Sequence, residues 1–205
     1  MSEKAKDVHE YIEIQKAAIA QNPECGNSHY NLAVALMGLR KFDEAEAELH
    51  TAVDCSPNLA EAYIQLGAIC MQRGDSDGAM YYNKMSTKAR AGFAPGYANI
   101  GFFHLQKGEA DEAIKFLQKA IVYNSKFVQA YTTLANAYLL KGLLDESIDA
   151  NRKAIEIQPD FPLPYYNIGI AYIEKGEIES ARESINKAKE MGYEVPDAIM
   201  KEIES

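Results

Sequence analysis

Long apolar runs, paired cysteines and the motifs of common catalytic sites are all missing from this sequence of 205 residues. No run of about 18 apolar residues could cross a bilayer, and the first residues lack the apolar stretch of a secretory signal peptide. We therefore expect a cytoplasmic protein. A Gly-rich phosphate loop, a nucleophile elbow and a paired-carboxylate site are also absent, so we expect neither catalysis nor a cofactor.

The three cysteines do not form the paired framework of small secreted domains, and we expect them to be reduced. Antiparallel helix pairing would bring Cys25, His29 and Cys55 near one another, and two thiolates with an imidazole can hold zinc. The close C-x-x-C spacing of strong zinc sites is lacking. We therefore expect ordinary packing at these residues and no bound metal.

Basic residues are too few to form a face that binds nucleic acid. The formal net charge is −9 and the isoelectric point is near 5.0. A protein that follows a phosphodiester backbone needs clustered Lys and Arg to neutralise phosphates. We expect no nucleic-acid partner and no membrane partner.

What the chain does contain is a period of 34 residues. Tyrosines recur at this interval as Tyr63, Tyr97, Tyr131 and Tyr165, and glycines recur as Gly74, Gly108, Gly142 and Gly176. A fixed period of this length indicates supersecondary units that bury their apolar faces only by stacking on their neighbours. The predicted organisation is a half repeat over 1–25, five units over 26–59, 60–93, 94–127, 128–161 and 162–195, and a capping helix over 196–205, all in one structural domain.

Each unit is predicted to be a hairpin of two helices. The eighth residue of each unit is small, which would let the second helix come close: Ala33, Gly67, Gly101, Ala135 and Gly169. The second helix is predicted to begin at an acidic residue that accepts free backbone amides: Asp43, Asp77, Asp111, Asp145 and Glu179. A cation before each turn glycine is expected to offset the negative end of the first helix: Arg73, Lys107, Lys141 and Lys175.

These units resemble the tetratricopeptide repeat, whose pattern is W/Y-x-x-L-G-x-x-Y followed by two spaced alanines. The fifth unit matches it with Tyr165, Ile168, Gly169, Tyr172, Ala181 and Ala188. The resemblance covers all five units and implies an all-α fold, a right-handed α-solenoid of antiparallel helix pairs (TPR superhelix). It also implies that the protein is a non-catalytic adaptor that binds another protein.

Several residues depart from the family pattern. Arg40 replaces the turn glycine of the first unit, and His29 replaces its leading aromatic residue. Asn83 and Asn151 occupy a place where the family usually buries an aromatic ring. We expect the two amides to be partly buried and hydrogen-bonded to nearby backbone, with a contact site as the alternative.

The face of each first helix that points away from its partner helix is predicted to bind a protein segment. Thirteen of the fifteen residues at the fifth, ninth and twelfth places are apolar and none is charged, and the sixth place holds an amide or hydroxyl side chain. In the resembled family this face lines the concave side. The predicted partner-binding residues are Tyr30, Asn31, Val34, Ile64, Gln65, Asn99, Phe102, Leu105, Thr133, Asn136, Tyr166, Asn167 and Ile170.

The predicted partner is an extended or helical segment that is apolar and largely uncharged. Family members that hold an acidic C-terminal tail use a clamp of Lys, Asn and Arg, and this chain supplies only the Asn, so we expect no such tail. Two alternatives remain open. The sixth-place amides can be framework residues, and the chain's own N-terminal segment or a second copy can cover the face.

The second functional hypothesis is a self-assembling structural scaffold. Residues 1–25 would form a single helix without its partner, with an apolar stripe that includes Val8, Tyr11 and Ile12. Because a solenoid end without a polar cap is adhesive, residues 8–21 could join copies into a homo-oligomer. At the other end, Ile199 and Ile203 share one face of a short helix that is predicted to cap the solenoid.

Overall fold

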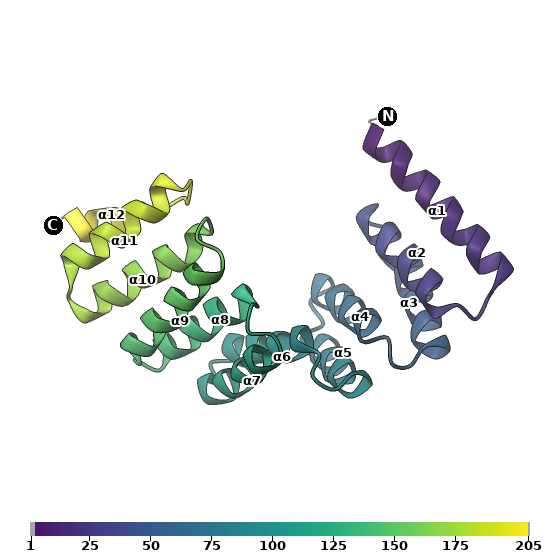
Figure 1. Cartoon of the computed structure of the whole chain (residues 1–205), viewed down its shortest axis with the longest axis horizontal. Coiled ribbons are helices and arrows are strands. Elements are labelled where there is room, and N and C mark those ends of the chain that lie inside the picture. The colour runs from purple at the N-terminus through teal and green to yellow at the C-terminus, as the bar shows by residue number, and fades with distance from the viewer. Residues whose placement is uncertain (1–2, 205) are drawn as a thin grey trace. The chain divides into compact units, whose positions relative to one another are not determined.

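The computed structural model describes residues 3–204, with side chains from residue 7 onward; residues 1, 2 and 205 lie outside the description. Within that range the chain forms twelve α-helices and no strand, which confirms the predicted all-α class (Figure 1). The chain divides into two compact units, Met1–Gly96 and Tyr97–Ser205, and each is described by itself. The prediction of one structural domain, and of its repeat boundaries, stays a prediction.

The first unit holds five helices and the first turn of a sixth. They are α1 (Glu3–Gln21), α2 (Gly26–Gly38), α3 (Phe42–Cys55), α4 (Ala60–Gln72) and α5 (Ser76–Ala89). Helices α2 and α3 form one hairpin, and α4 and α5 form the next (Figure 1). Buried Leu32, Leu49 and Leu66 join these helices in a single core.

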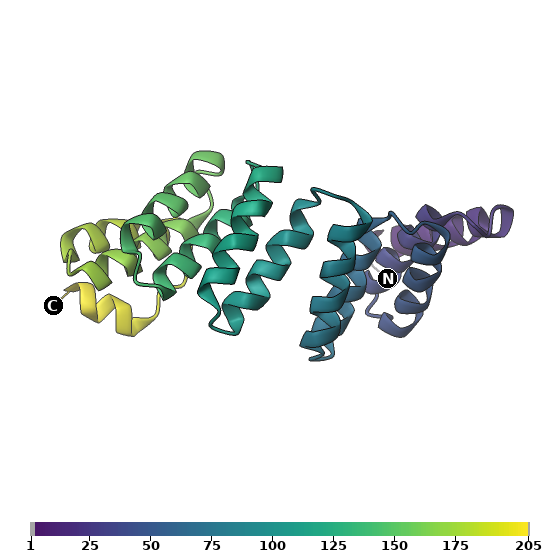
Figure 2. The same ribbon diagram turned by 90° about the horizontal axis from the view of Figure 1, so that it is seen from below.

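The second unit contains most of α6 (Ala94–Gln106) and six further helices. They are α7 (Ala110–Tyr123), α8 (Val128–Leu140), α9 (Leu144–Ile157), α10 (Pro162–Lys175), α11 (Ile178–Glu190) and α12 (Asp197–Glu204). Helices α8 to α11, green to yellow in Figure 2, pack side by side in chain order. The short α12 lies on α11 and buries Ile203 there.

Small residues at the eighth place of the hairpins let the helices approach closely. A methyl group on Gly101 would lie 2.6 Å from Leu117 Cγ, and one on Gly169 would lie 2.4 Å from Ile185 Cγ1. The turn glycines are required by the backbone conformation and not by packing. Gly142 and its equivalents have φ angles near 75°, which residues with a side chain rarely adopt. Arg40 adopts the same left-handed conformation, with φ 60°, in the one hairpin without the glycine.

The predicted caps of the second helices are wrong in detail. These helices begin one residue before the predicted acids, and only Asp75 accepts a cap hydrogen bond, from the backbone N–H of Gly78. Asp43 and its equivalents lie inside the first turn, where a side chain stabilises the helix through its charge and not as a cap.

The acids of the first turn instead form ion pairs with the following hairpin. The Arg73 guanidinium donates to Asp43 at 2.6 Å, the Lys141 ammonium to Asp111 at 2.6 Å, and the Lys175 ammonium to Asp145 at 2.8 Å. Each pair joins residues 30 positions apart. Three of the cations predicted to offset helix ends, Arg73, Lys141 and Lys175, therefore also tie a first helix to the second helix of the hairpin before it.

Two asparagines are buried in the hairpins as expected. The Asn83 side-chain amide donates to the Ala79 carbonyl oxygen at 2.8 Å, and that of Asn151 donates to the Ser147 carbonyl oxygen at 3.1 Å. Both side chains are almost fully buried. Bonding to the carbonyl four residues earlier gives each amide nitrogen an acceptor within its own helix.

Candidate partner-binding surface

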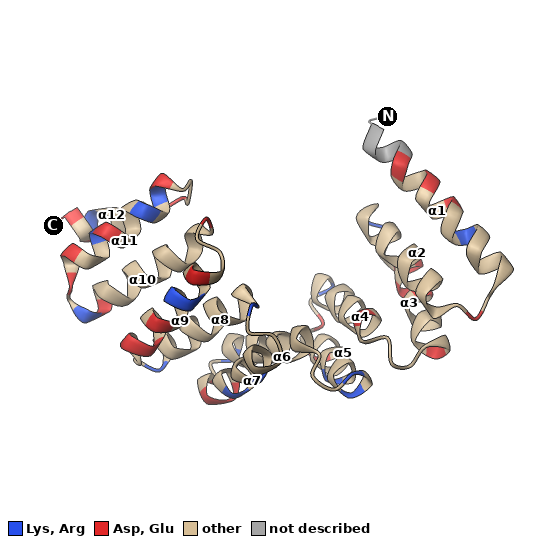
Figure 3. Cartoon of the chain, in the orientation of Figure 1, with Lys and Arg blue, Asp and Glu red and all other residues tan. Residues whose placement is uncertain are grey.

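Charged residues avoid the first helix of every hairpin. Helices α2, α6 and α8 contain no Lys, Arg, Asp or Glu, and α4 contains only Glu61. In α10 the charges are confined to Glu174 and Lys175 at its end. Figure 3 shows these helices tan along most of their length, whereas the second helices carry red and blue segments. The uncharged surface of the chain therefore lies on the first helices.

In the first unit the predicted residues lie on α2 and α4. Val34 is exposed by 41%, and Tyr30, Asn31, Ile64 and Gln65 are half-buried. Because none of the five is closed off in the core, all remain available to a partner. Tyr30 also packs against the apolar core, so its ring is held on one side.

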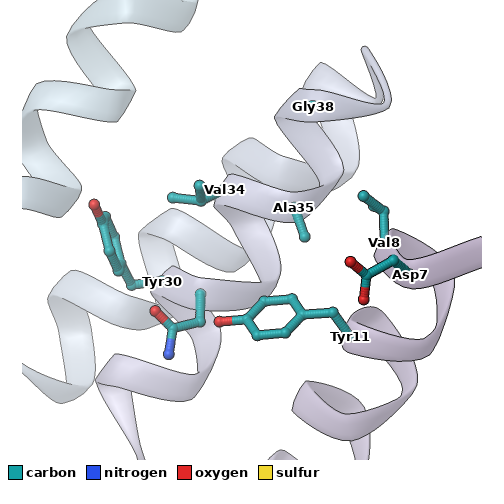
Figure 4. A pocket seen from close by; sticks show the side chains of 8 residues that line it. Asp7, Val8, Tyr11, Tyr30, Val34, Ala35 and Gly38 are labelled. Carbon is teal, nitrogen blue, oxygen red and sulfur yellow. The ribbon is translucent and has the colours of Figure 1, made fainter. Parts of the chain in front are cut away.

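A groove of about 400 Å³ lies between α1 and α2 (Figure 4). Helix α2 contributes three predicted side chains, Tyr30, Asn31 and Val34, and the small residues Ala35 and Gly38. Helix α1 contributes the opposite wall: Asp7, Val8 and Tyr11. The N-terminal helix therefore flanks the predicted face of α2 and leaves a groove beside it.

Asp7, Val8 and Tyr11 lie outside the predicted set of partner-binding residues. One sequence feature could have indicated Tyr11: it is a large residue at a place where every later unit has a small one. The corresponding residues in the 34-residue register are Ala45, Ala79, Ala113, Ser147 and Ala181. Those small residues are buried inside hairpins, whereas Tyr11 on α1 is exposed by 42%. Its ring points from α1 toward α2 (Figure 4).

In the second unit the predicted residues lie on α6, α8 and α10. Phe102 and Asn136 are exposed, while Asn99, Leu105, Thr133, Tyr166 and Ile170 are half-buried. Helices α8 and α10 touch each other directly, so the structure brings Asn136 and Ile170 onto neighbouring first helices. The predicted residues thus fall into two groups, one in each unit.

Two polar residues of this second group have distinct surroundings. The Thr133 hydroxyl donates to the Gln129 carbonyl oxygen of its own helix at 2.8 Å, which uses its donor. Asn167 is only 8% exposed, and its side-chain nitrogen has no hydrogen-bond partner within the described residues. A buried amide without an acceptor costs free energy, so Asn167 is the residue of this group most in need of a ligand carbonyl.

The Tyr166 ring already has a partner within the chain. Tyr193, which lies between α11 and α12, stacks on it with ring centroids 4.6 Å apart and an interplanar angle of 30°. Burial raises the pKa of the Tyr166 hydroxyl, and the nearby Tyr193 adds to that effect. This contact could not be predicted from the sequence, because no pattern in the repeat places Tyr193 beside the preceding first helix.

The residues considered as a zinc site have other roles. His29 Nδ1 lies 2.6 Å from a Glu48 carboxylate oxygen, and its Nε2 lies 2.9 Å from the Pro23 carbonyl oxygen. The Ser28 hydroxyl donates to the Cys25 sulfur at 3.2 Å. Among the residues that the structure describes, no group of three His, Cys, Asp or Glu side chains is arranged to hold a metal ion.

Three family descriptions match the chain, and all are of tetratricopeptide repeats. One model matches residues 15–60 and 30–93, a second matches 94–126 and 164–191, and a third, described as TPR repeat, matches 135–176. The chain belongs to the tetratricopeptide-repeat family. Members of this family are in general non-catalytic modules of protein–protein interaction. No curated protein matches the sequence.

Solved structures of TPR proteins share the fold. The crystal structure of MamA protein is 28% identical, with a TM-score of 0.69, and the alignment covers 85% of this chain and 98% of that one. YrrB, described as a TPR protein with an unusual peptide-binding site, is 22% identical with a TM-score of 0.69, covering 88% and 93%. Pseudomonas aeruginosa pilF is 15% identical with a TM-score of 0.75, covering 84% and 79%.

In the described part of the chain, none of the helices has both the length and the apolar character needed to cross a membrane.

Proposed function

We propose that this protein is a non-catalytic adaptor that binds an extended or helical, largely uncharged protein segment on its first helices. The observation that carries the proposal is the uncharged face of α6, α8 and α10, where exposed Phe102 lies in the same unit as the unsatisfied amide of Asn167. Phe102 offers an apolar contact, and the buried Asn167 amide would donate to a backbone carbonyl of a partner that uncovers it on binding.

The expected affinity follows from the size of such a surface. Contact faces of this kind bury roughly 300 to 600 Å² of apolar area, which at about 25 cal/mol per Å² contributes on the order of 8 to 15 kcal/mol. Association costs of about 4 to 15 kcal/mol offset much of that gain. We therefore propose an affinity of roughly micromolar strength. The absence of a full carboxylate clamp argues against an acidic C-terminal tail as the ligand.

The α1–α2 groove supports the same function in the first unit. Its walls are mostly apolar, and Tyr30, Asn31 and Val34 come from the predicted set. The peptide-binding site named for YrrB is consistent with this kind of function, although at 22% identity that likeness concerns the fold alone. The cytoplasmic location expected from the sequence stays a prediction.

The test is affinity capture from native cells with a double variant, Phe102→Asp and Tyr166→Ala. We expect it to lose the proteins that the unchanged chain retains, because a charge replaces the apolar contact. The matched control is Val122→Asp, which puts the same charge at a 79% exposed residue of α7, a second helix of the same unit. Thermal midpoints within a few degrees would show that all chains are folded. Capture of the same proteins by the double variant would refute the proposal.

A second candidate function, self-assembly through residues 8–21, is favoured by two exposed apolar side chains on α1. Tyr11 is exposed by 42% and Ile14 by 56%. Light scattering of the full chain is the test, and Tyr11→Ser with Ile14→Ser is the variant, since neither change touches the buried contacts of Ile12. If the protein is a scaffold, the particle mass of this variant should fall by a whole multiple of the chain mass. A full chain that is monomeric at high concentration would exclude this function.

A further inference from the structure

A hollow of about 500 Å³ lies between α8 and α9, outside the predicted binding residues. Tyr131, Leu134 and Tyr138 of α8 form its apolar side, and Glu146 and Ala150 of α9 lie opposite them. We refer to this depression as the α8–α9 hollow. All its residues belong to the second unit.

The preceding hairpin shows why the α8–α9 hollow exists. There the His104 ring stacks on Phe116, with centroids 5.3 Å apart and planes within 5° of parallel. In the 34-residue register His104 corresponds to Tyr138 and Phe116 corresponds to Ala150. The ring that fills the α6–α7 hairpin is therefore reduced to a methyl group in the next one, and the Tyr138 ring stacks on no aromatic ring among the described residues.

The Tyr138 ring is nevertheless held in place. Its hydroxyl oxygen accepts a hydrogen bond from the Gln118 side-chain amide of α7 at 3.1 Å. Ala150, 7% exposed, lines the α8–α9 hollow with a methyl group that leaves room for a flat group. A flat group entering the hollow would meet a ring that is already oriented, which lowers the entropic cost of stacking.

The charges around the hollow leave one carboxylate without a partner. Arg152 donates to Asp149 at 3.2 Å and to the Tyr172 hydroxyl oxygen at 3.2 Å, and Lys153 donates to Glu156 at 2.8 Å. Both cations of the lining are thus engaged. Glu146 forms no ion pair with any described residue, so the site's unmatched charge is negative.

We propose that the α8–α9 hollow binds an arginine side chain of a protein partner, with the guanidinium stacked on Tyr138 and paired with Glu146. The guanidinium is planar, always charged and weakly hydrated, so it can stack on Tyr138 in the space left by the missing ring and form an ion pair with the Glu146 carboxylate. A lysine ammonium would pair with Glu146 but has no plane to stack. This site is separate from the uncharged faces of the first helices and does not depend on them.

The binding test uses three blocked tripeptides: acetyl-Ala-Arg-Ala-amide, its citrulline analogue and its lysine analogue. Citrulline keeps the planar group without the charge, and lysine keeps the charge without the plane. Backbone amide resonances of Tyr138, Glu146 and Ala150 report binding by NMR titration of the full chain. We expect saturable shifts with the arginine peptide at about millimolar concentration, and at least about fivefold weaker binding of the other two.

Two variants and one control locate the site. Ala150→Phe restores the ring found at Phe116 and should abolish the shifts by filling the hollow. Glu146→Gln should weaken arginine binding about fivefold and remove the preference over citrulline. The control is Glu112→Gln, the equivalent change in the α6–α7 hairpin, which should leave the titration unchanged.

The outcomes are distinct. Absence of shifts with the arginine peptide, equal binding of citrulline, or unchanged binding by both Ala150→Phe and Glu146→Gln would each overturn the proposal. Saturable binding of phenyl phosphate in place of the arginine peptide would also overturn it, because it would mean that Arg152 and Lys153 define an anion site. If Ala150→Phe fails to fold, the Glu146→Gln titration decides the result.

Discussion

Replacing Gly169 with alanine tests the close helix contact on which each hairpin depends. The new methyl carbon would lie 2.4 Å from Ile185 Cγ1 and 3.0 Å from its Cδ1 atom. Overpacking of this kind costs about 1 to 3 kcal/mol, whereas Gly to Ala in a helix interior gains about 1 kcal/mol. We therefore expect Gly169→Ala to lower the free energy of unfolding by about 0 to 2 kcal/mol.

A double-variant cycle with Ile185→Ala isolates the contact. Ile185 is fully buried, so its truncation alone should cost about 2 to 5 kcal/mol. In that background the added methyl group has room, and we expect Gly169→Ala to become neutral or stabilising by up to about 1 kcal/mol. The predicted coupling is thus about 1 to 3 kcal/mol.

Urea unfolding followed by circular dichroism measures all four proteins of the cycle. The control is Gly38→Ala at the end of α2, where an added methyl group meets no atom within 4 Å and should not destabilise. Equal effects of Gly169→Ala with and without Ile185, within about 0.5 kcal/mol, would refute the packing argument.

Three further outcomes follow from the structure. Arg40→Gly should raise the free energy of unfolding by roughly 1 kcal/mol in urea titrations, because glycine adopts φ 60° without strain; a loss of stability would contradict this. A hydrogen bond to Asp145, and secondly one to Glu177, raises the pKa of the Lys175 ammonium above its usual 10.5. The difference in unfolding free energy between the unchanged chain and Lys175→Met should therefore be constant below pH 10.5 and decline above it. A difference that stays constant to pH 12 would exclude the ion pair. The Ser28 hydrogen bond lowers the pKa of the Cys25 thiol and burial raises that of Cys70, so Cys25 should react before Cys70 with a disulfide reagent near pH 8, as mass spectrometry of the labelled chain can check.

The helix pairs and their close approach could be predicted from the sequence because both depend on local spacing. Tyr63, Gly67 and Gly74 fall at fixed steps along one helical face and the turn that follows it, and the next three units repeat the tyrosine, a small residue and the turn glycine at the same steps. The place of a residue in the repeat indicates whether its side chain faces the interior of the hairpin. This is why Asn83 could be predicted to be buried with its amide bonded to backbone, although the family has an aromatic ring there.

Contacts that depend on side-chain direction between distant residues could not be predicted in this way. The pairing of Lys141 with Asp111 needs the relative position of two hairpins, which the period alone does not supply. The stacking of Tyr193 on Tyr166 depends on the path of an irregular segment. The cap of α5 by Asp75 depends on a helix start shifted by one residue, and sequence patterns do not fix helix ends at that precision.

The Tyr193 ring covers Tyr166, so this part of the second unit's uncharged face is open to a partner only when Tyr193 moves away. A partner that stacks on Tyr166 must first displace Tyr193, so the intrinsic affinity of the ring is reduced by the free energy of that internal contact. By reciprocity, an occupied face would favour release of the segment that connects α11 and α12. The segment that holds Tyr193 and the ligand would then compete for the Tyr166 ring, and faster proteolysis of the α11–α12 segment would report that the uncharged face is occupied.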